Sequence, residues 1–242
     1  MNKKLYSVLI VSLLVFTLIT GVTEVGAQNI DEEQYYNGYL SAEPSTLDAS
    51  KGSDSYSNSI LLNVKEPLTR LAEDEDGNNY IEAAGAKSWE HNEDGTVWTF
   101  KIRDAKWSDG KPVKAQDYEY GIKRSLDPET ASPYAYLITP IKNASQVNSG
   151  DLPVEELGVK ALDDKTLQIT LESPTPYFLD LTYQRVMLPQ RKDIVEKYGA
   201  KYGSEKEYLV YNGPFTVKTW AHNSKLVLEK NNNYWDKKSV KF

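Results

Sequence analysis

The fold is inferred first from residues 89–136, whose sequence is W-E-H-N-E-D-G-T-V-W-T-F-K-I-R-D-A-K-W-S-D-G-K-P-V-K-A-Q-D-Y-E-Y-G-I-K-R-S-L-D-P-E-T-A-S-P-Y-A-Y. Its first part alternates apolar and polar residues, which is the period-two pattern of a half-buried strand. The apolar positions are Trp98, Phe100 and Ile102. An Asp-Gly turn sequence at residues 94–95 precedes them, so residues 89–103 are predicted to form a hairpin.

The spacing of apolar residues then changes from two to four. Tyr118, Ile122 and Leu126 recur every four residues, which predicts an amphipathic helix that ends before Pro128. Alternating apolar residues on both sides of a polar turn predict a further hairpin at residues 157–172. Strands and helices therefore mix along the chain, and we predict an α/β fold with a sheet and at least one covering helix.

Five motifs in a fixed order resemble the extracytoplasmic oligopeptide- and dipeptide-binding proteins of ABC importers. They are W-T-F-K-I-R (98–103), A-K-W-S-D-G-K-P-V (105–113), D-P-E-T-A-S-P-Y-A-Y (127–136), N-G-P-F-T-V-K-T-W (212–220) and E-K-N-N-N-Y-W-D (229–236). The resemblance extends over residues 39–242. It implies a periplasmic-binding-protein-like fold (type II, cluster C) and a protein that binds a solute without transforming it.

The resemblance also implies a domain organisation. Residues 28–65 and 189–242 are expected to form an incomplete first lobe, and residues 66–188 a smaller inserted domain. The opposite lobe of the family has no counterpart in this sequence, nor does the acidic residue that pairs with the amine of a bound peptide in relatives. We therefore expect a truncated cleft with fewer ligand contacts and a reduced affinity.

The N-terminal residues have the pattern of an export signal. Lys3 and Lys4 precede an apolar run at residues 5–19, and small residues end the segment at Ala27. Residues 1–27 are thus predicted to be a signal peptide, the alternative being a retained N-terminal anchor. Many relatives carry a lipidated cysteine after the apolar run, but Val22 stands there and the chain has no cysteine. The expected product is periplasmic or extracellular, without a lipid anchor.

The composition excludes several classes of function. A net charge of −7 argues against nucleic acid or an anionic membrane as partner. Without cysteine there can be no disulfide, thiolate metal site or cysteine nucleophile. The only histidines, His91 and His222, lie in or beside separate turn sequences, and the adjacent Asp163 and Asp164 lie in a turn where carboxylates point apart. We predict no catalytic residue, no metal and no cofactor.

The residues implied in ligand binding lie in two separate segments. By the resemblance, Ser53, Asp54 and Ser55 line the ligand cleft and pair with the main chain of a peptide. Tyr134 would offer the peptide its ring face and its hydroxyl. The alternative interpretation is structural: the first segment is a loop before a helix that Ser57 or Asn58 caps, and Tyr134 packs in the core beside the hinge.

The predicted function is that of a solute-binding component, present as a monomer, that captures oligopeptides for ABC permease subunits at a membrane. Within the family, the ligand could instead be a nickel chelate, heme, a sugar or a signalling peptide. A different class, a secreted glycan-active enzyme or glycan-binding module, stays open because tyrosine and tryptophan are frequent. Tyr39 and Leu40 are expected to lie in the first strand of the fold.

Overall fold

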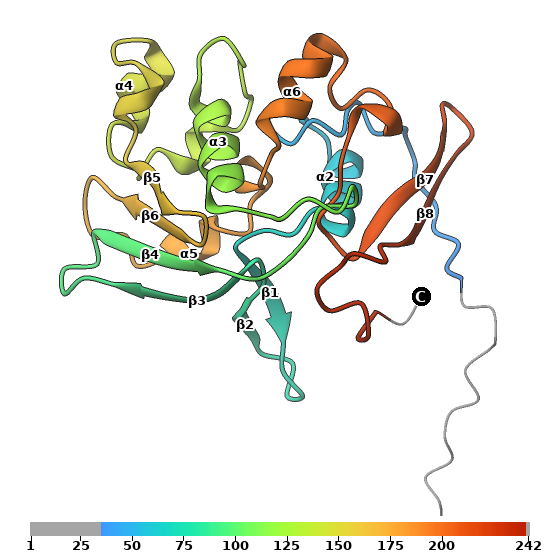
Figure 1. Cartoon of the computed structure of the whole chain (residues 1–242), viewed down its shortest axis with the longest axis horizontal. Coiled ribbons are helices and arrows are strands. Elements are labelled where there is room, and N and C mark those ends of the chain that lie inside the picture. Colours follow the sequence, from blue (N-terminus) through green and yellow to red (C-terminus); the bar gives the residue numbers. More distant parts are fainter. Residues whose placement is uncertain (1–34, 241–242) are drawn as a thin grey trace, which may run out of the picture. The chain divides into compact units, whose positions relative to one another are not determined.

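The computed structural model describes residues 35–240, and the predicted signal peptide lies outside this range. From Gly38 onward the described chain forms one compact unit. Its strands are β1 (Thr69–Glu73), β2 (Asn79–Ala83), β3 (Ala86–His91), β4 (Val97–Ile102), β5 (Val159–Asp163), β6 (Thr166–Thr170), β7 (Phe215–Ala221) and β8 (Lys225–Lys230) (Figure 1). Its α-helices are α2 (Ser55–Val64), α3 (Ala115–Leu126), α4 (Ala144–Ser149), α5 (Phe178–Leu181) and α6 (Lys192–Tyr198). Short 3₁₀ turns lie at Ala135–Ile138, Val154–Glu156, Arg185–Met187, Gly199–Lys201 and Lys206–Tyr208.

The central sheet is antiparallel, with the strand order β3-β4-β6-β5. The predicted hairpins at residues 89–103 and 157–172 are confirmed, and β4 of the first pairs with β6 of the second. Phe100 stands opposite Leu167 in this register. A separate hairpin of β1 and β2 projects away from the sheet (Figure 1).

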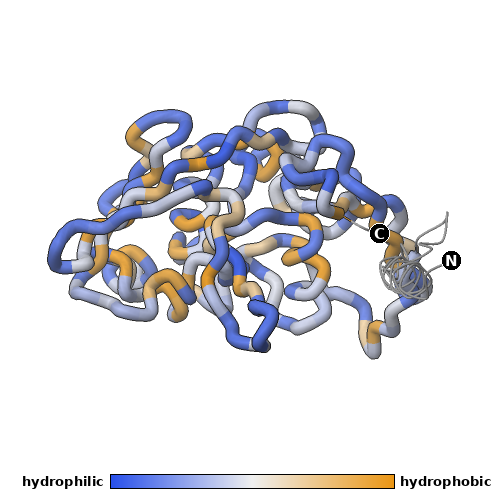
Figure 2. Tube along the Cα trace, turned by 90° about the horizontal axis from the view of Figure 1, so that it is seen from below, coloured by the Kyte–Doolittle hydropathy of each residue, from blue (hydrophilic) through white to orange (hydrophobic). Residues whose placement is uncertain are grey.

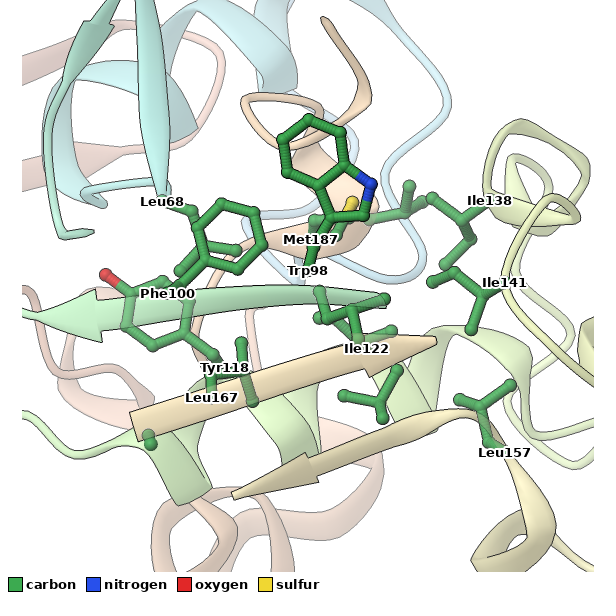
Figure 3. Close-up of a cluster of buried hydrophobic side chains, with 14 of the residues drawn as sticks. Leu68, Trp98, Phe100, Tyr118, Ile122, Ile138, Ile141, Leu157, Leu167 and Met187 are labelled. Carbon is green, nitrogen blue, oxygen red and sulfur yellow. The ribbon is translucent and has the colours of Figure 1, made fainter. Parts of the chain in front are cut away.

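The first hydrophobic core lies between this sheet and α3. As the alternation predicts, Trp98, Phe100 and Ile102 are buried, and the four-residue repeat of α3 is buried as well. Figure 3 shows Tyr118 and Ile122 of this helix among the side chains of the sheet. The buried members of this core run from Leu68 to Met187 in the sequence.

A second hydrophobic core brings together segments from both ends of the described chain. Leu61 and Val64 of α2 pack with Leu188, Tyr211 and Val217 of the later segments. Here β7 and β8 form their own antiparallel pair, and α2 lies against β7. Figure 2 shows hydrophobic stretches of the chain alternating with hydrophilic outer loops. The described chain therefore has two cores, built from segments that differ in their place in the sequence.

Polar residues occupy the junction where the chain passes from the second core to the first. The buried Lys65 donates a hydrogen bond from Nζ to the carbonyl of Val210 at 2.8 Å. Next to it, buried Glu66 accepts hydrogen bonds from Tyr234 (3.1 Å) and Trp235 (3.3 Å). Burial lowers the pKa of Lys65 to about 7 and raises that of Glu66, because each charge is withdrawn from water.

The prediction of a first strand at Tyr39 and Leu40 is wrong. These residues are irregular, Tyr39 is 89% exposed, and no strand within residues 35–240 pairs with them. The segment that follows Leu40 contacts the β7–β8 hairpin through the side chain of Glu43 instead. The carboxylate of Glu43 accepts hydrogen bonds from Trp220 Nε1 (3.0 Å) and the backbone of Asn223 (2.9 Å) on the β7–β8 hairpin.

Candidate ligand-binding site

The first predicted segment lies where the chain enters α2. Ser53 and Ser55 are exposed, and Asp54 is partly buried. Within residues 35–240, the backbone N–H groups of Ser53, Asp54 and Ser55 donate no hydrogen bond. Such groups before and at the first turn of a helix have no partner within the helix, so they are free to bind an acceptor from outside.

The N-cap of α2 is Asp54. The prediction that Ser57 or Asn58 caps this helix is therefore wrong. Its carboxylate accepts hydrogen bonds from the Ser57 backbone N–H (2.7 Å), the Ser57 hydroxyl (2.7 Å) and the Ser45 hydroxyl (2.5 Å). Partial burial by itself would raise the pKa of Asp54, but the hydrogen bonds from Ser45 and Ser57 outweigh it and hold the pKa at about 2. The Asp54 side chain thus serves the fold, and only its backbone is left for a ligand.

Replacing Asp54 by alanine should lower the free energy of unfolding by about 1 kcal/mol at neutral pH, because α2 loses its cap. The folded-state pKa of about 2 lies below the ordinary 3.8, so this stabilisation is present above pH 3.8 and is lost as the pH falls through 2. Urea unfolding at several pH values measures both effects. Ser59→Ala, later in the same helix, is the control, and an equal loss in both variants would contradict the cap.

The second predicted segment reaches the first through a hydrogen bond between distant parts of the sequence. Tyr134 is half-buried against the first core, and its hydroxyl donates to the carbonyl of Ser53 at 3.1 Å. Its ring lies 5.9 Å from the ring of Tyr136, which is largely exposed. The structure therefore brings Ser53 and Tyr134 together, although they belong to segments associated with different cores.

Arg185 is a further member of this cluster that the sequence analysis did not identify. Its guanidinium lies over the Tyr134 ring, 4.3 Å from the ring centroid, and Nη1 donates to the carbonyl of Asp54 at 3.3 Å. Arg185 is only 7% exposed. A signal was present in the sequence, since a charged residue stands directly before the apolar residues 186–188.

A second polar cluster, around His222, connects separate parts of the chain to one another. His222 lies between two carboxylates: Nδ1 contacts Glu43, and Nε2 lies 3.2 Å from Glu205. Hydrogen bonds to these carboxylates raise the pKa of His222. Among residues 35–240, no group of three His, Asp, Glu or Cys side chains is arranged to hold a metal ion. In the same range, no helix combines the length and the apolar character that a membrane span needs.

Comparisons with known proteins agree on one family. The family described as "Bacterial extracellular solute-binding proteins, family 5 Middle" matches residues 81–242. The oligopeptide-binding protein OppA of Bacillus subtilis is 37% identical over 248 residues, which cover 99% of this chain and 45% of that protein. The chain thus spans less than half the length of this curated relative.

Solved structures give the same result. The substrate-binding domain of an oligopeptide ABC transporter from Bacillus anthracis superposes with a TM-score of 0.84 at 44% identity, covering 87% of this chain and 40% of that one. Listeria monocytogenes OppA bound to peptide gives a TM-score of 0.77 at 39% identity, covering 82% of this chain and 39% of that one. The periplasmic-binding-protein-like α/β fold expected from the motifs is confirmed.

Proposed function

Since the chain belongs to the bacterial extracellular solute-binding proteins of family 5, we propose that it carries part of the peptide-capturing component of an ABC importer. Its ligand would be an oligopeptide, and its partners would be the permease subunits of the importer. The proteins of this family bind substrates for transport, and we propose that this chain also has no catalytic activity. We further propose that it acts as a monomer outside the cytoplasm, exported by residues 1–27.

The free backbone N–H groups of Ser53, Asp54 and Ser55 are the single observation that carries this proposal. A peptide presents a row of carbonyl groups whose geometry does not depend on its sequence, and exposed N–H groups of a binding protein pair with them. Tyr134 lies beside these groups, because its hydroxyl contacts Ser53. An aromatic ring at that place adds apolar contact area at a small cost in side-chain entropy.

The two cores support the proposed domains. The buried members of the first core lie between Leu68 and Met187, within the proposed inserted domain of residues 66–188. Those of the second core lie before residue 65 and from Leu188 onward. All of them except Leu188, the last residue of the proposed inserted domain, fall within a lobe of residues 28–65 and 189–242. Ser53 and Tyr134, which are hydrogen-bonded to each other, would then lie where these two domains meet. We propose that a bound peptide contacts both at one side of the interlobe cleft, whose other side the opposite lobe forms in relatives.

Thermal unfolding with added peptide tests this function. A synthetic pool of tri- and tetrapeptides should raise the unfolding midpoint of the 242-residue chain as its concentration increases, because a ligand bound only by the folded state stabilises it. At a free ligand concentration of one hundred times Kd, the gain is about 2.7 kcal/mol. Free amino acids of the same composition are the matched control. A midpoint that high peptide concentrations leave unchanged would refute peptide binding by this chain.

A further inference from the structure

Arg185 is a buried cation without a carboxylate partner in the described part of the chain. No carboxylate oxygen of an Asp or Glu within residues 35–240 lies within 4 Å of its guanidinium nitrogens. The other buried arginine, Arg191, is paired with Asp109 at 3.2 Å and Asp193 at 2.6 Å. Burying a charge is costly unless other contacts compensate for the lost water, so the contacts that Arg185 does make need an explanation.

Two contacts replace the missing carboxylate, and both belong to the candidate site. The guanidinium lies over the face of Tyr134, in the geometry of a cation–π interaction. Its Nη1 also donates to the carbonyl of Asp54, between the free N–H groups of that segment. The neighbouring Gly52 allows this approach, because a Cβ there would lie 3.2 Å from Nη1. Arg185 thus touches both segments that the proposed function assigns to the ligand.

We propose that Arg185 is a positioning residue that fixes the ring of Tyr134 and the backbone of residues 53–55 relative to each other before a ligand binds. This inference rests on the proposed function. Because Arg185 is 7% exposed, little of its surface could contact a ligand directly, and its effect passes through Tyr134 and the Asp54 carbonyl. A site that is already ordered loses less conformational entropy on binding, so its affinity is higher.

Substitutions at Arg185 should weaken binding of the tri- and tetrapeptide pool. Arg185→Met removes the charge and should raise Kd about tenfold. Arg185→Lys keeps a cation but lacks the flat guanidinium that stacks on a ring, so it should recover part of the loss. Arg103→Met is the control, since Arg103 also stacks on a ring, that of Trp235 at 3.7 Å. The control should change Kd less than twofold.

A double-mutant cycle with Tyr134→Leu separates positioning from general destabilisation. If Arg185 acts through Tyr134, Arg185→Met should change Kd much less in the Tyr134→Leu background than in the wild type. In the ligand-free protein, the NMR signals of the labelled Tyr134 ring should shift in Arg185→Met, while those of Tyr80 on β2 stay in place. Fold-changes in Kd that simply multiply, or Tyr134 signals that do not move, would overturn the inference.

Different results would refute peptide binding by the chain and positioning by Arg185. If the wild-type chain does not bind the peptide pool, the proposed function is refuted, and the NMR signals of Tyr134 still decide whether Arg185 positions the ring. If the wild type binds but Arg185→Met binds equally well, the proposed function stands and the role of Arg185 is refuted.

Discussion

Replacing Phe100 by alanine should lower the free energy of unfolding by about 3–5 kcal/mol. Phe100 is fully buried in the middle of β4, and its ring lies 6.4 Å from the rings of both Trp98 and Phe178. Figure 3 shows it beside Leu167, its partner on β6. The shorter side chain leaves a cavity that these neighbours fill only in part, so the loss exceeds the transfer free energy of the ring alone.

Urea unfolding followed by tryptophan fluorescence measures this loss, provided that the denaturant dependence is the same in both proteins. The matched control is Thr99→Ala on the opposite face of the same strand, where the expected cost is at most about 1 kcal/mol. A loss for Phe100→Ala no larger than that of the control would mean that the face of β4 bearing Phe100 is not the face that forms the core.

The second large effect is expected at the ion pair between Asp48 and Arg124. Arg124 donates from Nη1 to one carboxylate oxygen at 2.6 Å and from Nη2 to the other at 2.7 Å. The Asp48 side chain is 3% exposed and that of Arg124 is 11% exposed. Arg124→Met should therefore cost about 3–5 kcal/mol, because it leaves a buried carboxylate without its partner.

This pair also joins the two cores, since Asp48 lies between residues of the second core and Arg124 lies on α3 of the first. The control is Lys192→Met on α6. Lys192 pairs with Glu196 at 3.7 Å, and both side chains are largely exposed (66% and 62%), so the expected cost is at most about 1 kcal/mol. Equal unfolding free energies in the two variants would show that the buried pair is dispensable.

The sequence predicted the parts of the fold that depend on local patterns. The strand with Trp98 and Phe100 was predictable, because one of its faces is buried and every second side chain must be apolar. The helix with Tyr118 and Ile122 was predictable for the corresponding reason, with a period of nearly four. The prediction of a strand at Tyr39 and Leu40 was wrong because an isolated pair of apolar residues gives no information about a strand that could pair with it.

The candidate site was harder to predict because its contacts are not local. Asp54, Ser57 and Asn58 all belong to residue types that cap helices, so composition could not select the one that does. Tyr134 meets Ser53 across 81 residues of sequence, and Arg185 meets Asp54 across 131. No periodicity links such positions. Ser53 and Tyr134 became candidates through the resemblance to a family. Arg185 was identified as part of the site only from its contacts in the folded chain.

An NMR map of backbone amide signals during titration with the tri- and tetrapeptide pool would locate the bound peptide on the chain. We expect the largest changes at the amides of Ser53, Asp54 and Ser55 and at Tyr134, and no change at the tip of the β1–β2 hairpin, residues 74–78. Signals of these four residues that stay in place while peptides bind elsewhere, or that never move at any peptide concentration, would contradict this expectation.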